Sequence, residues 1–397
     1  SFPAGYAILE KLKKGGSEMS IAGLLIRRER LARMWSQEGL CRGICGTSYL
    51  SKIEQGKAEA SEEILALLFA RLGLSWTEDE TLRAQTEACM EALFAGDAAA
   101  FAAAFAPLHT QERTLLCSPC APDYLLLRSL AAETDGERRP LDAEFIPFLD
   151  RRQLALQRVL EGRHEEAALL YPAAAIRLWQ GARLYAFGRY AAATEALRAA
   201  YDAAAAEGFA HIMMSCRVYL GNCCSDLGDL KQMQQHYAVA QRLAEALGDR
   251  ETLAMIRYNA AATKIECGDF AAAYAYFSTL EEPNALALHK LAVCCEALGR
   301  RDEALAALAR AEAMLHSGEE HEPERQMLAL VRCRLEQPDP LHDERYGALL
   351  TECFALLRRE RGAGYARFHL PWMLAWYKAN RRYREACALL ENFPIEK

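Results

Sequence analysis

Residues 181–197 read GARLYAFGRYAAATEAL, and the same 17-residue pattern returns at 221–237, 261–277 and 292–308. Each copy has a small residue in first place, a glycine in eighth place and a large apolar residue in last place. Glycine adopts the left-handed backbone of a tight turn without strain, and two helices approach closely only where their side chains are small. The pattern therefore predicts pairs of antiparallel helices, with the last residue of each copy filling the gap to the next repeat.

Strand signals are nearly absent beyond residue 76, and strong helix formers with apolar residues three and four apart dominate the chain. The turn glycines Gly188, Gly228 and Gly268 are 40 residues apart. This pattern resembles the tetratricopeptide repeat, lengthened from about 34 residues by a longer helix or loop. The resemblance implies an all-α body over 151–397, wound as a right-handed superhelix. Weaker turns are expected at three further places: Gly96, Gly162 and Arg381.

The chain has 397 residues, enough for two or three domains, and 52% of them are hydrophobic, so a sizeable core can form. Its 47 basic and 54 acidic residues give a net charge of −7. This charge excludes a protein that binds nucleic acid with a positively charged surface over the whole molecule. Residues 20–76, in contrast, carry eight basic and six acidic side chains. A mildly basic head on an acidic body indicates two parts with different tasks.

Fourteen cysteines are present, most of them inside apolar helical runs, where they behave as small hydrophobes in a reducing cytosol. No signal peptide is expected, and no apolar run reaches the roughly 18 residues of a membrane helix. We therefore expect a soluble, cytoplasmic protein.

Cys117 and Cys120 form a single Cys-x-x-Cys without a second pair for zinc, so inert thiols are favoured over a redox switch. No catalytic motif is visible, and we expect no enzyme activity, cofactor or metal.

Two segments fall outside the clear patterns. Residues 1–18 end in a flexible Gly-Gly-Ser linker, and we interpret them as an extension or expression remnant, with a fused ligand peptide as the alternative. Residues 77–150 are broken repeatedly by proline, and we interpret them as a linker helix with irregular early repeats. The remaining boundaries are a head at 19–76 and a repeat domain at 151–397.

The head contains several short helices, and residues 44–56 read ICGTSYLSKIEQG. Together with Arg30 and Ser36-Gln37-Glu38, this string resembles the lambda-repressor-like (XRE) helix-turn-helix, whose second helix enters the major groove. The resemblance implies a buried structural pair between Glu54 and Arg30. A departure is Gly46, where a polar contact residue is common. A small helical bundle with a basic face is the alternative.

The same resemblance assigns DNA contacts by position. Bases would be reached from the start of the second helix, and phosphate from the start of the preceding helix. The DNA-binding residues implied are Gln37 for phosphate, Thr47, Ser48 and Lys52 for the bases, and Ser51 beside them. The core residues implied are Ile44, Leu50 and Ile53.

A helix-turn-helix followed by such repeats resembles the peptide-pheromone regulators of Gram-positive bacteria (the Rgg, NprR, PlcR and PrgX group, RRNPP), and residues 40–45 are most like the PlcR branch. The resemblance implies a homodimer on double-stranded DNA, controlled by a short signalling peptide in the concave groove of the repeats. Asparagine side chains clasp the peptide backbone there, because an amide both donates and accepts.

We expect the first helix of each repeat to line this groove. The peptide-binding residues expected are Arg183, Tyr185, Asn222, Tyr258, Asn259 and His289. Among them, Asn222 and Asn259 are the candidate clasps, while Arg183 and His289 are candidates for a peptide carboxylate. Two alternatives remain open: repeats that bind a protein partner instead of a peptide, and an interaction protein whose head no longer binds DNA.

Overall fold

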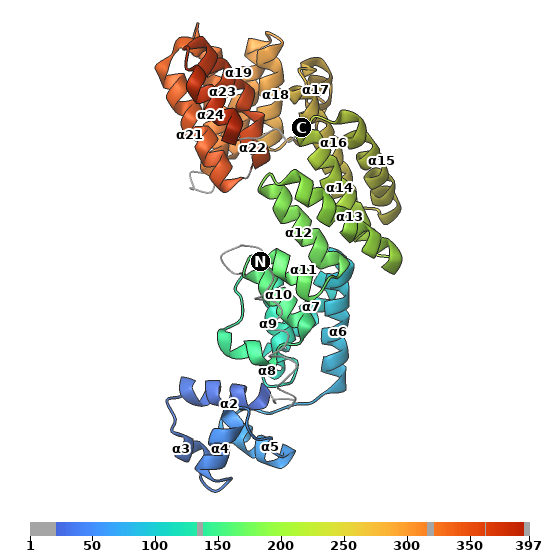
Figure 1. Ribbon diagram of the computed structural model, residues 1–397, viewed down its shortest axis with the longest axis vertical. Coiled ribbons are helices and arrows are strands. Elements are labelled where there is room, and N and C mark those ends of the chain that lie inside the picture. Colours follow the sequence, from blue (N-terminus) through green and yellow to red (C-terminus); the bar gives the residue numbers. More distant parts are fainter. Residues whose placement is uncertain (1–20, 133–137, 316–320, 362, 393–397) are drawn as a thin grey trace. The chain divides into compact units, whose positions relative to one another are not determined.

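The computed structural model describes residues 21–132, 138–315, 321–361 and 363–392 (Figure 1). The extension at 1–18 lies outside these ranges. Every regular element within them is a helix, which confirms the predicted all-α class. None of these helices is long and apolar enough to cross a membrane. All fourteen cysteines lie in the described ranges and are free thiols.

The chain forms two compact units, which are described separately. The first contains the residues up to Gln180 together with Asp202–Ile212, and the second contains Gly181–Tyr201 and the chain from Met213 onward.

Four short helices form the head of the first unit: α2 (Ile21–Ala32), α3 (Gln37–Cys41), α4 (Thr47–Glu54) and α5 (Glu62–Arg71). Ser36 and Ser61 cap α3 and α5 by accepting hydrogen bonds from the backbone nitrogens of Gly39 and Ile64, a role that serine side chains often take. The buried core of the head also includes Phe145, which comes from outside the 19–76 segment.

The rest of the first unit consists of α6 (Glu80–Ala95), α7 (Ala98–Thr110), α8 (Glu112–Leu115), α9 (Ala121–Ala131), η1 (Ala143–Phe148), α10 (Arg151–Leu160) and α11 (His164–Leu170). Helices α6 and α7 pack as one pair, and α10 and α11 as another. Gly96 and Gly162 join the partners of each pair with left-handed φ angles of 71° and 75°. Both expected turns are therefore confirmed.

The repeat helices follow along the chain, and the first three of them have residues in both units. They are α12 (Ala174–Ala186), α13 (Tyr190–Glu207), α14 (Ala210–Asp226), α15 (Leu230–Leu247), α16 (Arg250–Glu266), α17 (Phe270–Phe277), α18 (Ala285–Ala297), α19 (Arg301–Met314), α20 (Glu322–Glu336), η3 (Pro340–His342), α21 (Glu344–Glu360), α22 (Ala363–Phe368), α23 (Leu370–Ala379) and α24 (Tyr383–Asn392). The four predicted turn glycines and Arg381 all have left-handed φ angles: Gly188, Gly228, Gly268, Gly299 and Arg381. Helices of 17 and 18 residues, such as α14 and α15, account for the 40-residue period.

Small residues let the two helices of a repeat touch. A Cβ atom added to Gly181 would lie 2.6 Å from Cγ of Leu197, and one added to Gly221 would lie 2.3 Å from Cε1 of Tyr237. The last residue of a copy therefore packs onto the first residue of the same copy, a contact that the sequence reasoning had not anticipated. Tyr237 also shares a buried cluster with Ile256 of α16, and so reaches the next repeat as expected.

Candidate functional site

Helix α4, the second helix of the predicted helix-turn-helix, has one buried face and one face open to solvent. Leu50 and Ile53 are buried in the head, as predicted, whereas Ile44 is only half-buried at the edge of the core. The side chains expected to contact DNA lie on the other side. Thr47, Ser48 and Lys52 are exposed, and Ser51 is half-buried. This pattern leaves a polar face of α4 free to contact another molecule.

A buried ion pair ties α4 to α2. Nε of Arg30 lies 2.7 Å from Oε1 of Glu54, and Nη2 lies 2.8 Å from Oε2, so the contact is bidentate. Both side chains are less than 10% exposed. The structural pair implied by the XRE resemblance is therefore present. Gln37 joins it by donating its Nε2 hydrogen to Oε2 of Glu54, at 2.8 Å, and its contact with phosphate stays a prediction.

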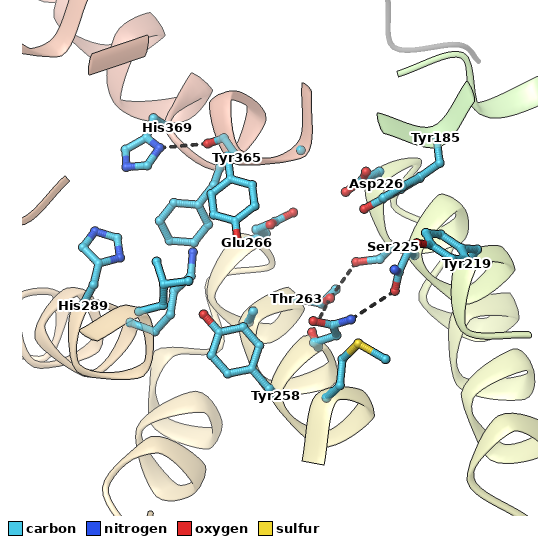
Figure 2. Close-up of a pocket in the computed structure, with 18 of the residues that line it drawn as sticks. Tyr185, Tyr219, Ser225, Asp226, Tyr258, Thr263, Glu266, His289, Tyr365 and His369 are labelled. Carbon is cyan, nitrogen blue, oxygen red and sulfur yellow. Dashed lines mark hydrogen bonds between the residues drawn. The ribbon is translucent and has the colours of Figure 1, made fainter. Parts of the chain in front are cut away.

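The second unit contains a pocket of about 460 Å³ (Figure 2). It contains five of the six residues expected to bind a peptide: Tyr185, Asn222, Tyr258, Asn259 and His289. Arg183 does not line it. That side chain is exposed, and its guanidinium lies 5.0 Å from the ring centroid of Phe187. Residues two apart on a helix point about 200° apart, so Arg183 and Tyr185 cannot share one face of α12.

An asparagine pair links two walls of the pocket. Oδ1 of Asn222 on α14 accepts hydrogen bonds from Oη of Tyr237, at 2.6 Å, and from Nδ2 of Asn259 on α16, at 3.2 Å. Beside them, the hydroxyl groups of Ser225 and Thr263 lie 2.6 Å apart. Neither asparagine bond uses Nδ2 of Asn222 or Oδ1 of Asn259. The pair therefore still offers one donor and one acceptor.

Tyrosine and phenylalanine side chains also line the pocket. Tyr185 and Tyr219 meet edge to face with ring centroids 5.8 Å apart. Tyr365 and Phe368 of α22 also line the pocket, and Figure 2 shows Tyr365 across the cavity from Tyr185. Helix α22 thus closes a side of the pocket that the clear repeats leave open.

Three charged residues of the pocket were missed by the sequence reasoning. Asp226 is buried, its Oδ2 has no hydrogen-bond partner among the described residues, and burial raises the pKa of its carboxyl group. Glu266 is open to the pocket, yet the surrounding protein raises its pKa as well. Burial lowers the pKa of Lys290, whose ammonium lies over the ring of Phe368. Asp226 and Glu266 occupy the sixth place of two successive repeat copies, a signal that could have identified them.

Two buried histidines lie at another side of the pocket. His289 and His369 have ring centroids 6.0 Å apart. Burial keeps the pKa of His289 well below its ordinary value, and the nearby Lys290 acts in the same direction. Burial therefore favours the neutral imidazole of His289, and a neutral ring does not pair with a carboxylate as a cation does.

The Cys-x-x-Cys motif belongs to the first unit, and neither cysteine lines this pocket. Cys117 and Cys120 are buried in the first unit, and burial raises the pKa of both thiols. Protonated thiols are poor nucleophiles and poor metal ligands. Among the described residues, no group of three or more histidine, cysteine or acidic side chains is placed to hold a metal ion.

Residues 26–78 match the family model HTH_3, described as helix-turn-helix. No curated protein matches the sequence. The solved structure of a Rap protein complexed with Competence and Sporulation Factor is similar to the chain at 14% identity, with a TM-score of 0.53, over 79% of this chain and 96% of that one. A second similar structure is the Rap conjugation gene regulator of plasmid pLS20 in complex with the Phr* peptide, at 14% identity and a TM-score of 0.45, over 95% and 98%. The chain therefore combines a helix-turn-helix of the HTH_3 type with the helical fold of a Rap protein.

Proposed function

We propose that this chain is a DNA-binding transcriptional regulator whose repeats bind a short signalling peptide, and that the peptide controls a homodimer on DNA. The observation that carries the proposal is the pocket built around Asn222 and Asn259, in a chain whose N-terminal residues match a helix-turn-helix.

The polar face of α4 suits the major groove. Thr47, Ser48 and Lys52 are exposed, and each is of a type that contacts base edges or phosphates in such domains. One recognition helix reads only about one half-site, so a homodimer is needed to read a complete operator. Because phosphate contacts release counterions, binding should weaken as salt rises.

The pocket suits an extended peptide. Each residue of an extended backbone presents an N–H donor and a C=O acceptor, which Oδ1 of Asn259 and Nδ2 of Asn222 can match. The aromatic walls can cover apolar side chains, while Asp226 and Lys290 place an acidic and a basic group where the two termini or charged side chains can bind. The Rap protein with a similar fold was solved in complex with Competence and Sporulation Factor, which supports a signalling ligand.

The DNA-binding half is tested by selecting duplexes from a random library with the full chain and measuring their affinity by fluorescence anisotropy. Changing Thr47→Ala together with Lys52→Ala should weaken binding at least tenfold, because each lost base contact costs about 1–3 kcal/mol. Lys231→Ala removes the same charge from an exposed position on α15 and serves as the control. Equal affinity of the double variant and the wild type would contradict the proposal.

The peptide-binding half is tested by native mass spectrometry of the protein purified from its own host. We expect a short peptide to co-purify with the wild type and with Arg183→Ala, because Arg183 lies outside the pocket. Changing Asn222→Ala and Asn259→Ala should remove it. Capture of the same peptide by the asparagine variant would contradict the assigned site. An empty pocket together with a co-purifying protein would favour a protein partner for the repeats.

A further inference from the structure

The head contains a hollow of about 300 Å³ beside the recognition helix. Six residues of α2, α3 and the end of α4 line it: Arg27, Arg30, Leu31, Gln37, Glu54 and Gln55. The charge of Glu54 is already neutralised by its buried bidentate contact with Arg30. The guanidinium of Arg27 therefore gives the hollow a net positive charge, next to the residue expected to contact phosphate.

Two neighbouring arginines of α2 are held very differently. Nη1 of Arg28 donates to Oδ2 of Asp142 at 2.5 Å, and its guanidinium lies 5.0 Å from the ring centroid of Phe145. Nη1 of Arg27 lies 3.8 Å from Oε1 of Glu144, and Nη1 of Arg28 lies 3.8 Å from Oε2 of the same carboxylate; both distances are too long for a hydrogen bond. Arg28 is therefore fixed on the body of the first unit, whereas Arg27 is only loosely paired.

We infer that Arg27 binds a backbone phosphate of DNA seated in this hollow, and that Glu144, which does not itself line the hollow, holds the Arg27 guanidinium when DNA is absent. The inference rests on the proposed DNA-binding function. A carboxylate and a phosphate offer a guanidinium the same chemistry, a negative charge on two oxygen acceptors in one plane. Glu144 precedes Phe145, which is anchored in the core of the head, so the carboxylate is held within reach of Arg27.

The inference predicts different effects on DNA affinity for changes at Arg27 and at the acidic partners of the two arginines. In the anisotropy assay with the selected duplex, Arg27→Gln should weaken binding and lower the slope of log affinity against log salt by about one phosphate contact. Glu144→Gln should raise affinity about two- to fivefold at low salt, because an exposed pair of this kind is weak. The same change made in the Arg27→Gln background should have a smaller effect, because only the long contact between Glu144 and Arg28 is then lost.

Asp142→Asn is the matched control, because it removes an acidic partner of Arg28 instead of Arg27. Asp142→Asn should lower thermal stability with little change in the salt slope. Arg27→Gln should lower the salt slope and leave thermal stability unchanged. An unchanged salt slope for Arg27→Gln, or equal effects of Glu144→Gln with and without Arg27, would overturn the inference while DNA binding itself stands. A wild-type chain that binds no duplex would overturn both this inference and the proposed function.

Discussion

The Arg30–Glu54 pair provides a direct test of how the head is held together. Changing Glu54→Gln leaves the shape of the side chain almost unchanged but leaves the charge of Arg30 buried without an opposite charge. Breaking a buried pair in this way costs about 3–5 kcal/mol. Since about 1.4 kcal/mol is a factor of ten, protection of the head amides against hydrogen exchange should fall by roughly two to four orders of magnitude. Mass spectrometry of peptides from 21–76 in the full chain measures this directly.

Two controls make the result specific. Lys52→Ala lies on the exposed face of α4 and should leave exchange unchanged while weakening DNA binding. Arg30→Met combined with Glu54→Leu replaces the buried pair by apolar side chains and should recover most of the protection. The reasoning is refuted if Glu54→Gln keeps normal protection and still loses DNA binding, because the pair would then act at the DNA and not in the fold.

Three further changes test the packing and charge of the body. Gly221→Ala should lower the free energy of unfolding by about 1–3 kcal/mol in urea titrations, because the added Cβ would lie 2.3 Å from the Tyr237 ring; an unchanged midpoint would show that α14 and α15 separate freely. Tyr237→Phe removes the 2.6 Å bond to Asn222 and should cost about 1 kcal/mol in the same titration, whereas no cost would mean that the bond is not formed in solution. Burial raises the pKa of Asp123 to about 6, although Gln153 donates to it at 2.8 Å. The folded chain then holds a proton that the unfolded chain releases, so the wild type should lose about 1–3 kcal/mol as pH rises from about 4 to 6. Asp123→Asn should not show this loss, and parallel pH profiles of the two proteins would refute the assignment.

Local rules explain which features could be predicted from the sequence. The turn glycines, including Gly188 and Gly228, have the left-handed backbone that their spacing required. The partnership of Arg30 and Glu54 followed from the XRE resemblance. The site was predicted less completely because it depends on tertiary arrangement. Arg183 was placed on the inner face without accounting for the angle that separates it from Tyr185 on α12.

The wall formed by α22 could not be predicted. Tyr365 and Phe368 lie in a six-residue helix that belongs to none of the four clear repeat copies, so no period placed them beside Asn222. Lys290 was not predicted either, because its position in the pocket depends on its contact with the ring of Phe368. Only the folded chain brings these segments to one pocket.

The central claim is that the repeat pocket and the helix-turn-helix are thermodynamically linked. The most direct measurement is the affinity of the full chain for its selected duplex, with and without the peptide fraction of host culture medium, for the wild type and for the chain carrying Asn222→Ala and Asn259→Ala. We expect the fraction to change wild-type affinity by about 5- to 150-fold and to leave the asparagine variant unchanged. Identical wild-type affinity with and without the fraction, despite a peptide bound in the pocket, would contradict the account.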